Sequence, residues 1–296
     1  MMDKTAARHR GDVTEQALRT LDDCPDPRLR EIVTALVRHL HAFVREVRLT
    51  PAEWMAGIQF LTRVGQKCDA IRQEFILLSD TMGVTMAVDA VAHEDLPSGA
   101  TESSALGPFY TQDAPEIAQG ASIARSGKGE PARIRGRVLD LRGTPVAGAL
   151  VESWETDGEG TYDVQYADRS EPDYRGHLRT AADGSFEFLA IKPVSYSIPA
   201  DGPVGELLRS LHRDTMRPAH LHLKVSAPRF RPLATAIYSA DDPYLEDDAV
   251  FGVKASLIEA YRPARPVDGT TWTLDRDIVL ADAYISQASP CPNKSF

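Results

Sequence analysis

The sequence predicts an α+β protein in which a helical N-terminal part is followed by an antiparallel β-sandwich. In the first hundred residues, apolar side chains recur every three or four positions, which is the helical period. From Ala132 onward the period becomes two, and short runs alternate with turns rich in glycine and proline. A stretch of loop-forming residues lies between the two patterns. We therefore assign residues 1–105 to a helical domain with its linker and residues 106–296 to the sandwich.

Three helical segments are predicted before the linker. Residues 27–47 carry a broad apolar face, as expected for an amphipathic helix. A second helix is predicted to begin at Thr50-Pro51-Ala52-Glu53, because this order places a hydroxyl at the cap, a proline in the first turn and a glutamate three residues on. Gly65 is a candidate for its end. The third segment covers residues 70–92, with a break predicted at Gly83.

The second half of the chain contains short strand patterns separated by turns. Arg142-Gly143-Thr144-Pro145 is a predicted turn between the first two strands. The acidic segment 241–248 is interpreted as a solvated loop. The predicted strands are 132–138, 146–154, 185–191, 219–226, 234–239 and 271–280.

Composition excludes several classes of protein. The formal net charge is -10 and the pI is about 5.3, so nucleic acid is not an expected partner. No run of about 18 apolar residues predicts a membrane span, and the opening residues have no apolar core typical of a signal peptide. Cys24, Cys68 and Cys291 are far apart and form no CxxC pattern, which favours reduced thiols and a cytoplasmic location.

The segment Arg217-Pro218-Ala219-His220-Leu221-His222 is a candidate metal-binding motif. In a strand, residues i and i+2 point to the same face, so two imidazoles would converge. Imidazole suits iron, copper, zinc and nickel, although two ordinary polar residues on one face remain an alternative. No nearby carboxylate completes an HxD or HxxE pattern. Tyr162 follows a turn and Tyr196 lies between prolines; each alone is typical of a packing residue.

A resemblance to a known family covers more than two thirds of the chain. The stretch from about Glu53 to Tyr261 resembles the intradiol ring-cleavage dioxygenases, and within them the hydroxyquinol 1,2-dioxygenases. The matching segments are 74–80 (EFILLSD), 106–110 (LGPFY), 153–165 (SWE to GTYDVQ), 178–184 (LRTAADG), 196–205 (YSIPADGPVG), 217–222 (RPAHLH) and 242–245 (DPYL).

The resemblance implies one iron(III) per subunit, bound by Tyr162, Tyr196, His220 and His222. A phenolate is a hard anionic donor that suits iron(III), but free tyrosine has a pKa near 10, so it needs a strong local cation to stay ionised. By the same resemblance, Tyr196 would leave the metal and help take up a proton. Arg217 would stabilise negative charge on the ring, the alternative being a surface salt bridge.

The resemblance also implies a mostly apolar pocket around a flat aromatic ring. Asp80 is its exception, since a buried carboxylate needs a partner. The third hydroxyl of hydroxyquinol could supply one and catechol could not; a helix-surface aspartate is the alternative. Ala236 departs from the family, which usually has glutamine or histidine there. The residues implied to contact substrate are Leu77, Asp80, Leu106, Gly107, Pro108, Phe109, Ile198, Pro199, Arg217 and Val250.

The expected activity is cleavage of hydroxyquinol (1,2,4-trihydroxybenzene) by O2 between its adjacent hydroxyls, giving 3-hydroxy-cis,cis-muconate or maleylacetate in the degradation of aromatic compounds. Catechol or a chlorocatechol is the alternative substrate. A sandwich that binds metal or ligand without chemistry is the alternative from another class. The family resemblance further implies a homodimer formed through the helices of residues 1–105, with a phospholipid at the interface, and a catalytic role for residues 106–296.

Overall fold

The computed structural model describes residues 12–69, 72–169, 171–264 and 269–283. The opening eleven residues, on which the signal-peptide prediction rests, and Cys291 lie outside these ranges. Cys24 and Cys68 are free thiols. The chain divides into two compact units, residues 1–63 and 64–296. The helices after residue 70 therefore belong to the same unit as the sheets. The sequence pattern instead placed them in the helical domain of residues 1–105.

The first helices follow their sequence signals. In α3 (Pro27–Glu46) the Asp26 carboxylate accepts hydrogen bonds from the first backbone N–H groups. In α4 (Pro51–Lys67) Thr50 and Glu53 exchange bonds as a capping box, which confirms the predicted start. The predicted end at Gly65 is wrong: this glycine does not adopt a positive φ, and the helix continues to Lys67. A short helix, α2 (Val13–Arg19), was not predicted.

The third helical segment breaks where predicted. Gly83, at φ 73°, separates α5 (Glu74–Thr81) from α6 (Val84–Ala92) in a left-handed conformation that a side chain disfavours. Among the described residues no single helix is long and apolar enough to cross a membrane; α5 and α6 pass that test only as a pair bent by 74°.

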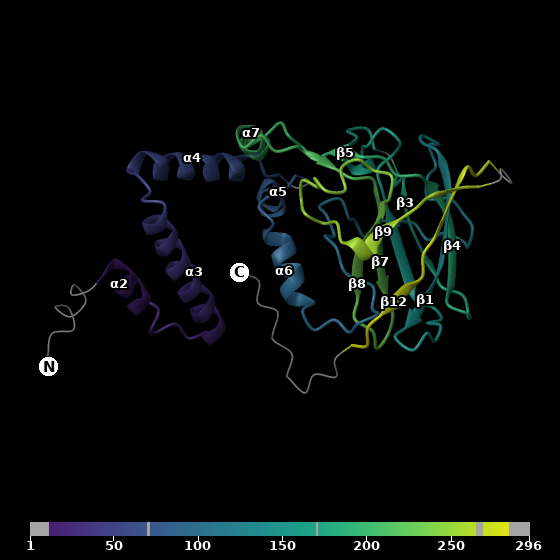
Figure 1. Cartoon of the computed structure of the whole chain (residues 1–296), viewed down its shortest axis with the longest axis horizontal. Helices are drawn as coiled ribbons and strands as arrows, with labels where there is room; N and C mark the ends of the chain where they lie inside the picture. The colour runs from purple at the N-terminus through teal and green to yellow at the C-terminus, as the bar shows by residue number, and fades with distance from the viewer. Residues whose placement is uncertain (1–11, 70–71, 170, 265–268, 284–296) are drawn as a thin grey trace. The chain divides into compact units, whose positions relative to one another are not determined.

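Ten of the described strands form two five-stranded sheets that pack as a sandwich, and two further short strands form a separate small sheet (Figure 1). One sheet has the order β10-β11-β1-β12, with β4 also paired to β1, and the other has the order β3-β2-β7-β8-β9. The strands are β1 (Pro131–Asp140), β2 (Leu150–Trp154), β3 (Arg175–Arg179), β4 (Ser185–Ile191), β5 (Tyr196–Ser197), β6 (Met216–Arg217), β7 (His220–Ser226), β8 (Leu233–Ser239), β9 (Ile258–Glu259), β10 (Arg262–Pro263), β11 (Trp272–Asp275) and β12 (Ile278–Leu280); α7 (Pro203–Ser210) follows β5.

The sandwich prediction is confirmed, but the sheets are mixed rather than purely antiparallel. Strand β1 runs parallel to β11 and β12, and β8 runs parallel to β9. These parallel partners are far apart in sequence, so no hairpin turn signals them. The predicted strand 271–280 is in fact two strands that both pair with β1, and the backbone of Arg276, between them, passes close to Gly136. Its carbonyl oxygen would lie 1.8 Å from a Cβ at Gly136, so only glycine fits there.

The main core lies between the two sheets. Strand β7 contributes Leu221, Leu223 and Val225 to it. The side chains that alternate with these, at His220 and His222, must therefore point to the opposite face of their sheet. The fold thus places the candidate site on the outer face of the second sheet.

Candidate active site

Two histidines of β7 and two tyrosines from separate loops converge in the structure. The Nε2 atoms of His220 and His222 lie 3.1 Å apart. The hydroxyl oxygens of Tyr162 and Tyr196 lie 3.3 Å apart. A single guanidinium nitrogen, Nη1 of Arg217, lies 3.3 Å from the Tyr196 hydroxyl and 3.2 Å from Nε2 of His220. The structure therefore brings these five residues together, and their role as a metal site stays a prediction.

Local structure explains how the two tyrosines are positioned beside the histidines. Asp157 accepts backbone hydrogen bonds from Glu159 and Thr161, closing the turn that delivers Tyr162 after β2. Tyr196, in β5, pairs with Arg217, in β6, so this tyrosine and the arginine share one small sheet.

The four donors fit one metal ion. Ligand atoms about 2 Å from a common ion lie about 3 Å from one another, as these pairs do. The Nδ1 of His220 donates to the carbonyl of Pro218 at 2.6 Å, which leaves the lone pair on Nε2 facing the other donors. Among the described residues no cluster of three or more His, Cys, Asp or Glu side chains could hold a metal, so the two phenols are the candidates for the further ligands of an ion at His220 and His222.

The protonation states of the histidines and of Tyr162 also fit a metal site. Burial lowers the pKa of both His220 and His222 well below the usual value, and the Arg217 charge adds to this, so both imidazoles are neutral donors. Burial, with the neighbouring Tyr196, raises the pKa of Tyr162 well above 10. A phenolate at this position therefore requires a cation, which a bound metal would provide.

Arg217 is not a surface residue. It is 3% exposed, and its Nε donates to Asp248 at 3.1 Å. Asp248 is itself 6% exposed, so the interpretation of segment 241–248 as a solvated loop is wrong for this residue. No local sequence pattern indicates this pair, because the two residues are 31 positions apart. Asp242, in the same segment, accepts from the Ser195 hydroxyl and from the Ala219 backbone, joining the loop before Tyr196 to the start of β7.

Tyr238 is a site residue that the sequence reasoning missed. It lies opposite His220 in the β7–β8 ladder and its ring is 5.3 Å from the imidazole. Its hydroxyl accepts from Nη2 of Arg217 at 3.3 Å and contacts the Ser104 hydroxyl at 3.0 Å. The period of two in β8 could have revealed it, since Tyr238 is two residues from Ala236.

Ala236 lies opposite His222 in the same ladder, as expected for a position beside the ligands. It is fully buried and offers only a methyl group. On the other side, Trp154 stacks on the His222 imidazole with ring centroids 4.7 Å apart. The buried Nδ1 of His222 has no hydrogen-bond partner among the described residues. Among the described residues, packing against Trp154 rather than a hydrogen bond at Nδ1 therefore orients this imidazole.

The expected pocket residues are brought to this face in part. Phe109 stacks on Tyr162 with centroids 4.5 Å apart, and a Cβ at Gly107 would lie 3.6 Å from Nε2 of His222. Asp80 is 7% exposed, so the helix-surface alternative for it is wrong. Leu106 and Pro108 are exposed and Pro199 is half-buried, and their contact with a ring stays a prediction. The other expected apolar residues, Leu77, Ile198 and Val250, are buried.

Hydrogen bonds from one side chain join helix α5 to the loop that carries Asp248. Arg213 donates from Nη1 to the carbonyl of Thr81 at 2.6 Å and from Nη2 to that of Ala249 at 3.1 Å. The helix bearing Asp80 and the loop bearing Val250 are thus held together by one side chain.

Comparison with known proteins gives the class that this fold and site define. Residues 105–282 match the family model described as Dioxygenase, and residues 26–99 match the model described as Catechol dioxygenase N terminus. The chain belongs to the intradiol ring-cleavage dioxygenase family and is an enzyme of that kind.

Within the family, the chain is similar to enzymes named for hydroxyquinol. It is 49% identical to the 6-chlorohydroxyquinol 1,2-dioxygenase of Cupriavidus pinatubonensis, covering 90% of this chain and 96% of that protein. It is 48% identical to the hydroxyquinol 1,2-dioxygenase of a Rhizobium species, covering 90% and 94%. The crystal structure of hydroxyquinol 1,2-dioxygenase from Pseudomonas putida superposes with a TM-score of 0.85 at 44% identity, covering 94% of this chain and all of that one.

Proposed function

We propose that the chain opens hydroxyquinol between its adjacent hydroxyls with O2, using one iron(III) per subunit bound by Tyr162, Tyr196, His220 and His222. The family generally depends on non-haem iron, and the convergence of four buried donors supports this ligand set. The product is the ring-opened dicarboxylic acid 3-hydroxy-cis,cis-muconate, or its keto form maleylacetate. The observation that carries the choice of hydroxyquinol is the buried carboxylate of Asp80.

Bound iron(III) would act as a Lewis acid and as a template for two adjacent hydroxyls. The chain's own groups do the rest. The phenolic oxygen of Tyr196 lies 3.3 Å from Nη1 of Arg217 and, in its ionised form, would take up a substrate proton. The Arg217 guanidinium, fixed by Asp248, offers a positive charge in a buried site, where it would stabilise negative charge on the ring more strongly than in water. Phe109, stacked on Tyr162, covers the donor set with an apolar surface.

Asp80 supports a trihydroxy substrate. Burial raises the pKa of its carboxyl, while the Thr85 hydroxyl, 2.5 Å from Oδ1, and the charge of Arg217 oppose that rise. The charge of Arg217 lowers the pKa of Asp80 and that of Asp248 raises it, which supports a position of Asp80 near these two residues. A further hydroxyl on the ring would donate to this carboxylate, and a catechol would leave it without that bond. Sites of this kind discriminate strongly against substrates that lack the hydroxyl.

The substitution Asp80→Ala is expected to reduce the preference for hydroxyquinol over catechol by roughly 10- to 100-fold, the worth of a buried hydrogen bond to a charged group. The measurement is kcat/KM by oxygen uptake on both substrates, corrected for the spontaneous oxidation of hydroxyquinol. Catechol is the internal control, because it lacks the third hydroxyl that would lose its hydrogen-bond partner in the variant. An unchanged ratio in the variant would show that Asp80 does not select the substrate.

The alternative substrates are tested in the same assay. Wild-type protein is offered hydroxyquinol, 6-chlorohydroxyquinol, catechol and a chlorocatechol. We expect fast uptake with the trihydroxy rings and slow uptake with the dihydroxy rings. A preference for catechol would keep the chemistry and overturn the substrate, whereas no uptake with any ring would favour a metal- or ligand-binding protein without chemistry.

We also propose that the protein is a cytoplasmic homodimer formed through its N-terminal helices. No residue of α3 is buried, and its apolar residues Leu36, Leu40 and Phe43 are 53%, 52% and 50% exposed. Such a stripe is typical of an interaction surface. A phospholipid lying at this interface would cover further apolar side chains.

The double substitution Leu36→Glu/Leu40→Glu is expected to convert the dimer to a monomer, because two carboxylates would be buried in an apolar interface. Light scattering of the purified protein measures the mass. The matched control is Arg38→Glu, which adds a carboxylate to the same helix without replacing an apolar residue. A variant that stays dimeric would place the interface elsewhere, and mass spectrometry of an organic extract would detect bound lipid.

A further inference from the structure

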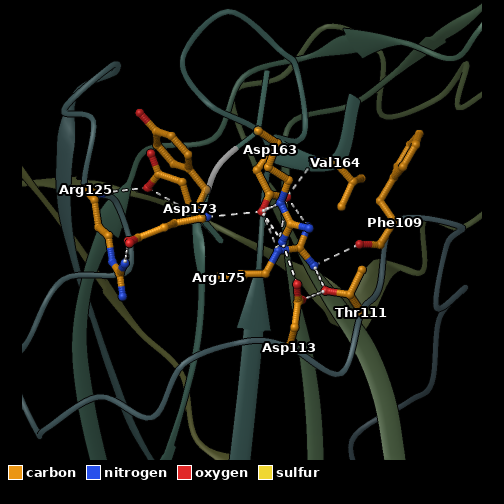
Figure 2. Close-up of polar contacts among 11 residues, drawn as sticks. Phe109, Thr111, Asp113, Arg125, Asp163, Val164, Asp173 and Arg175 are labelled. Atoms are coloured by element: carbon orange, nitrogen blue, oxygen red, sulfur yellow. Dashed lines mark hydrogen bonds and ion pairs between the residues drawn. The ribbon is translucent and has the colours of Figure 1, made fainter. Parts of the chain in front are cut away.

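A buried ion pair lies next to the donor set and has no part in the chemistry described above. Arg175 is 2% exposed and Asp163 is 5% exposed. The Nε of Arg175 lies 2.9 Å from Oδ2 and 3.1 Å from Oδ1 of Asp163, and Nη2 contacts the same carboxylate. Figure 2 shows the guanidinium pointing at this carboxylate between the loops that carry Phe109 and Val164.

The strand register puts Arg175 on the same face as the metal ligands. Arg175 lies opposite Trp154 in the β2–β3 ladder, and Trp154 lies opposite His222 in the β2–β7 ladder. Directly opposed residues share a face of the sheet. Arg175, Trp154 and His222 therefore form one row across three strands, with Trp154 stacked on His222 in the middle.

One branch of the Arg175 contacts leads to a metal ligand. Asp163 is the residue immediately after Tyr162 and begins the short 3-10 helix Asp163–Gln165. Its carboxylate also accepts from the backbone N–H of Val164 at 2.9 Å and of Asp173 at 3.1 Å. Holding this carboxylate fixes the backbone from which the Tyr162 side chain projects.

The other branch leads to the loop that covers the donor set. Nη1 of Arg175 donates to the carbonyl of Phe109 at 3.0 Å and to the Thr111 hydroxyl at 2.7 Å. Phe109 is the residue whose ring stacks on Tyr162, with centroids 4.5 Å apart and planes inclined by 26°. A single guanidinium thus holds both partners of that stack.

Such a pair is costly to bury, and apolar residues of similar volume often stabilise a fold as well or better. Its value here is geometric. The planar guanidinium donates along several fixed directions, so it can serve the carboxylate and the loop at once, which a lysine ammonium cannot do with the same geometry.

We propose that Arg175 is a positioning residue that fixes the Tyr162 ring against Phe109, setting the geometry of one metal ligand and the closure of the ring-binding loop together. This proposal rests on the proposed function. In this proposal Arg175 does not contact the substrate. It acts through Tyr162 and Phe109, which are the two residues proposed to lie beside the substrate.

Three variants separate the branches. Arg175→Lys keeps the positive charge and loses the planar guanidinium with its several donors. Thr111→Val removes one hydrogen-bond acceptor in the loop and leaves the ion pair intact. Arg169→Met is the control. Arg169 donates to the same Asp163 carboxylate at 3.0 Å and to Asp113 at 3.0 Å. Its side chain is 23% exposed, and among the described residues it makes no hydrogen bond to Phe109 or Thr111. The readouts are iron content, the visible tyrosinate-to-iron absorption band, kcat and KM for hydroxyquinol, and thermal unfolding.

We expect Arg175→Lys to lower kcat and raise KM by about tenfold each and to shift the absorption band, because groups that orient a metal ligand are typically worth ~10- to 100-fold. Thr111→Val should raise KM alone, and Arg169→Met should match the wild type in all but unfolding temperature. Wild-type kinetics and absorption in Arg175→Lys, an unchanged KM in Thr111→Val, or equal effects in Arg169→Met would overturn the proposal. A colourless, inactive wild-type protein would instead overturn the proposed function.

Discussion

Tyr162→Phe is expected to deprive the protein of its iron and its visible colour, and to reduce turnover of hydroxyquinol by more than the roughly 100-fold that a lost outer partner of a ligand can cost. The substitution keeps the buried ring and its stack on Phe109 and removes only the oxygen that lies 3.3 Å from the Tyr196 hydroxyl. Three donors would remain, and the negative charge that favours iron(III) over iron(II) would be halved. Iron content by mass spectrometry, the absorption spectrum and oxygen uptake measure the three consequences.

Tyr261→Phe is the matched control for this experiment. Tyr261 is also buried, at 7% exposed, and its hydroxyl has no hydrogen-bond partner among the described residues. It lies in the core between the sheets rather than on the site face. We expect this variant to keep its iron, colour and activity. Full iron and colour in Tyr162→Phe would exclude this tyrosine from the ligand set.

Arg217→Gln is expected to keep the iron and lose roughly 10²- to 10³-fold in kcat, the typical cost of removing one preorganised group that stabilises developing charge. Its guanidinium is buried, lies next to both Tyr196 and His220, and is held by Asp248 and Tyr238. Because the interaction would be strongest in the transition state, KM should change much less than kcat. Steady-state kinetics with matched iron content test this expectation.

Removing Arg217 also leaves the Asp248 carboxylate buried without its ion-pair partner, which destabilises a fold by itself. The double substitution Arg217→Gln/Asp248→Asn corrects for this, since the second change removes the orphaned charge. We expect it to recover unfolding temperature and no activity. Arg231→Gln, which breaks the ion pair with Asp95, controls for loss of any arginine. Recovered activity in the double variant would make Arg217 a structural residue only.

The types of donor and much of the fold were readable from the sequence because they depend on local pattern. The period-two run around His220 and His222 placed both imidazoles on one face, and the capping box at Thr50 and Glu53 placed a helix start. The break at Gly83 followed from the conformational freedom of glycine. The two tyrosines proposed as ligands were different, since neither lies in a pattern that indicates a metal. Only the family resemblance suggested them.

Tertiary structure alone decided which distant groups meet. The pairing of Arg217 with Asp248, the hydroxyl of Tyr238 beside that arginine and the row from Arg175 to His222 all depend on strand register and loop closure. The parallel partners of β1 and β8 depend on the same long-range contacts. A sequence specifies such contacts through the free energy of the whole packed core rather than through any local signal. For that reason the acidic segment 241–248 resembled a solvated loop while one of its carboxylates is buried in the site.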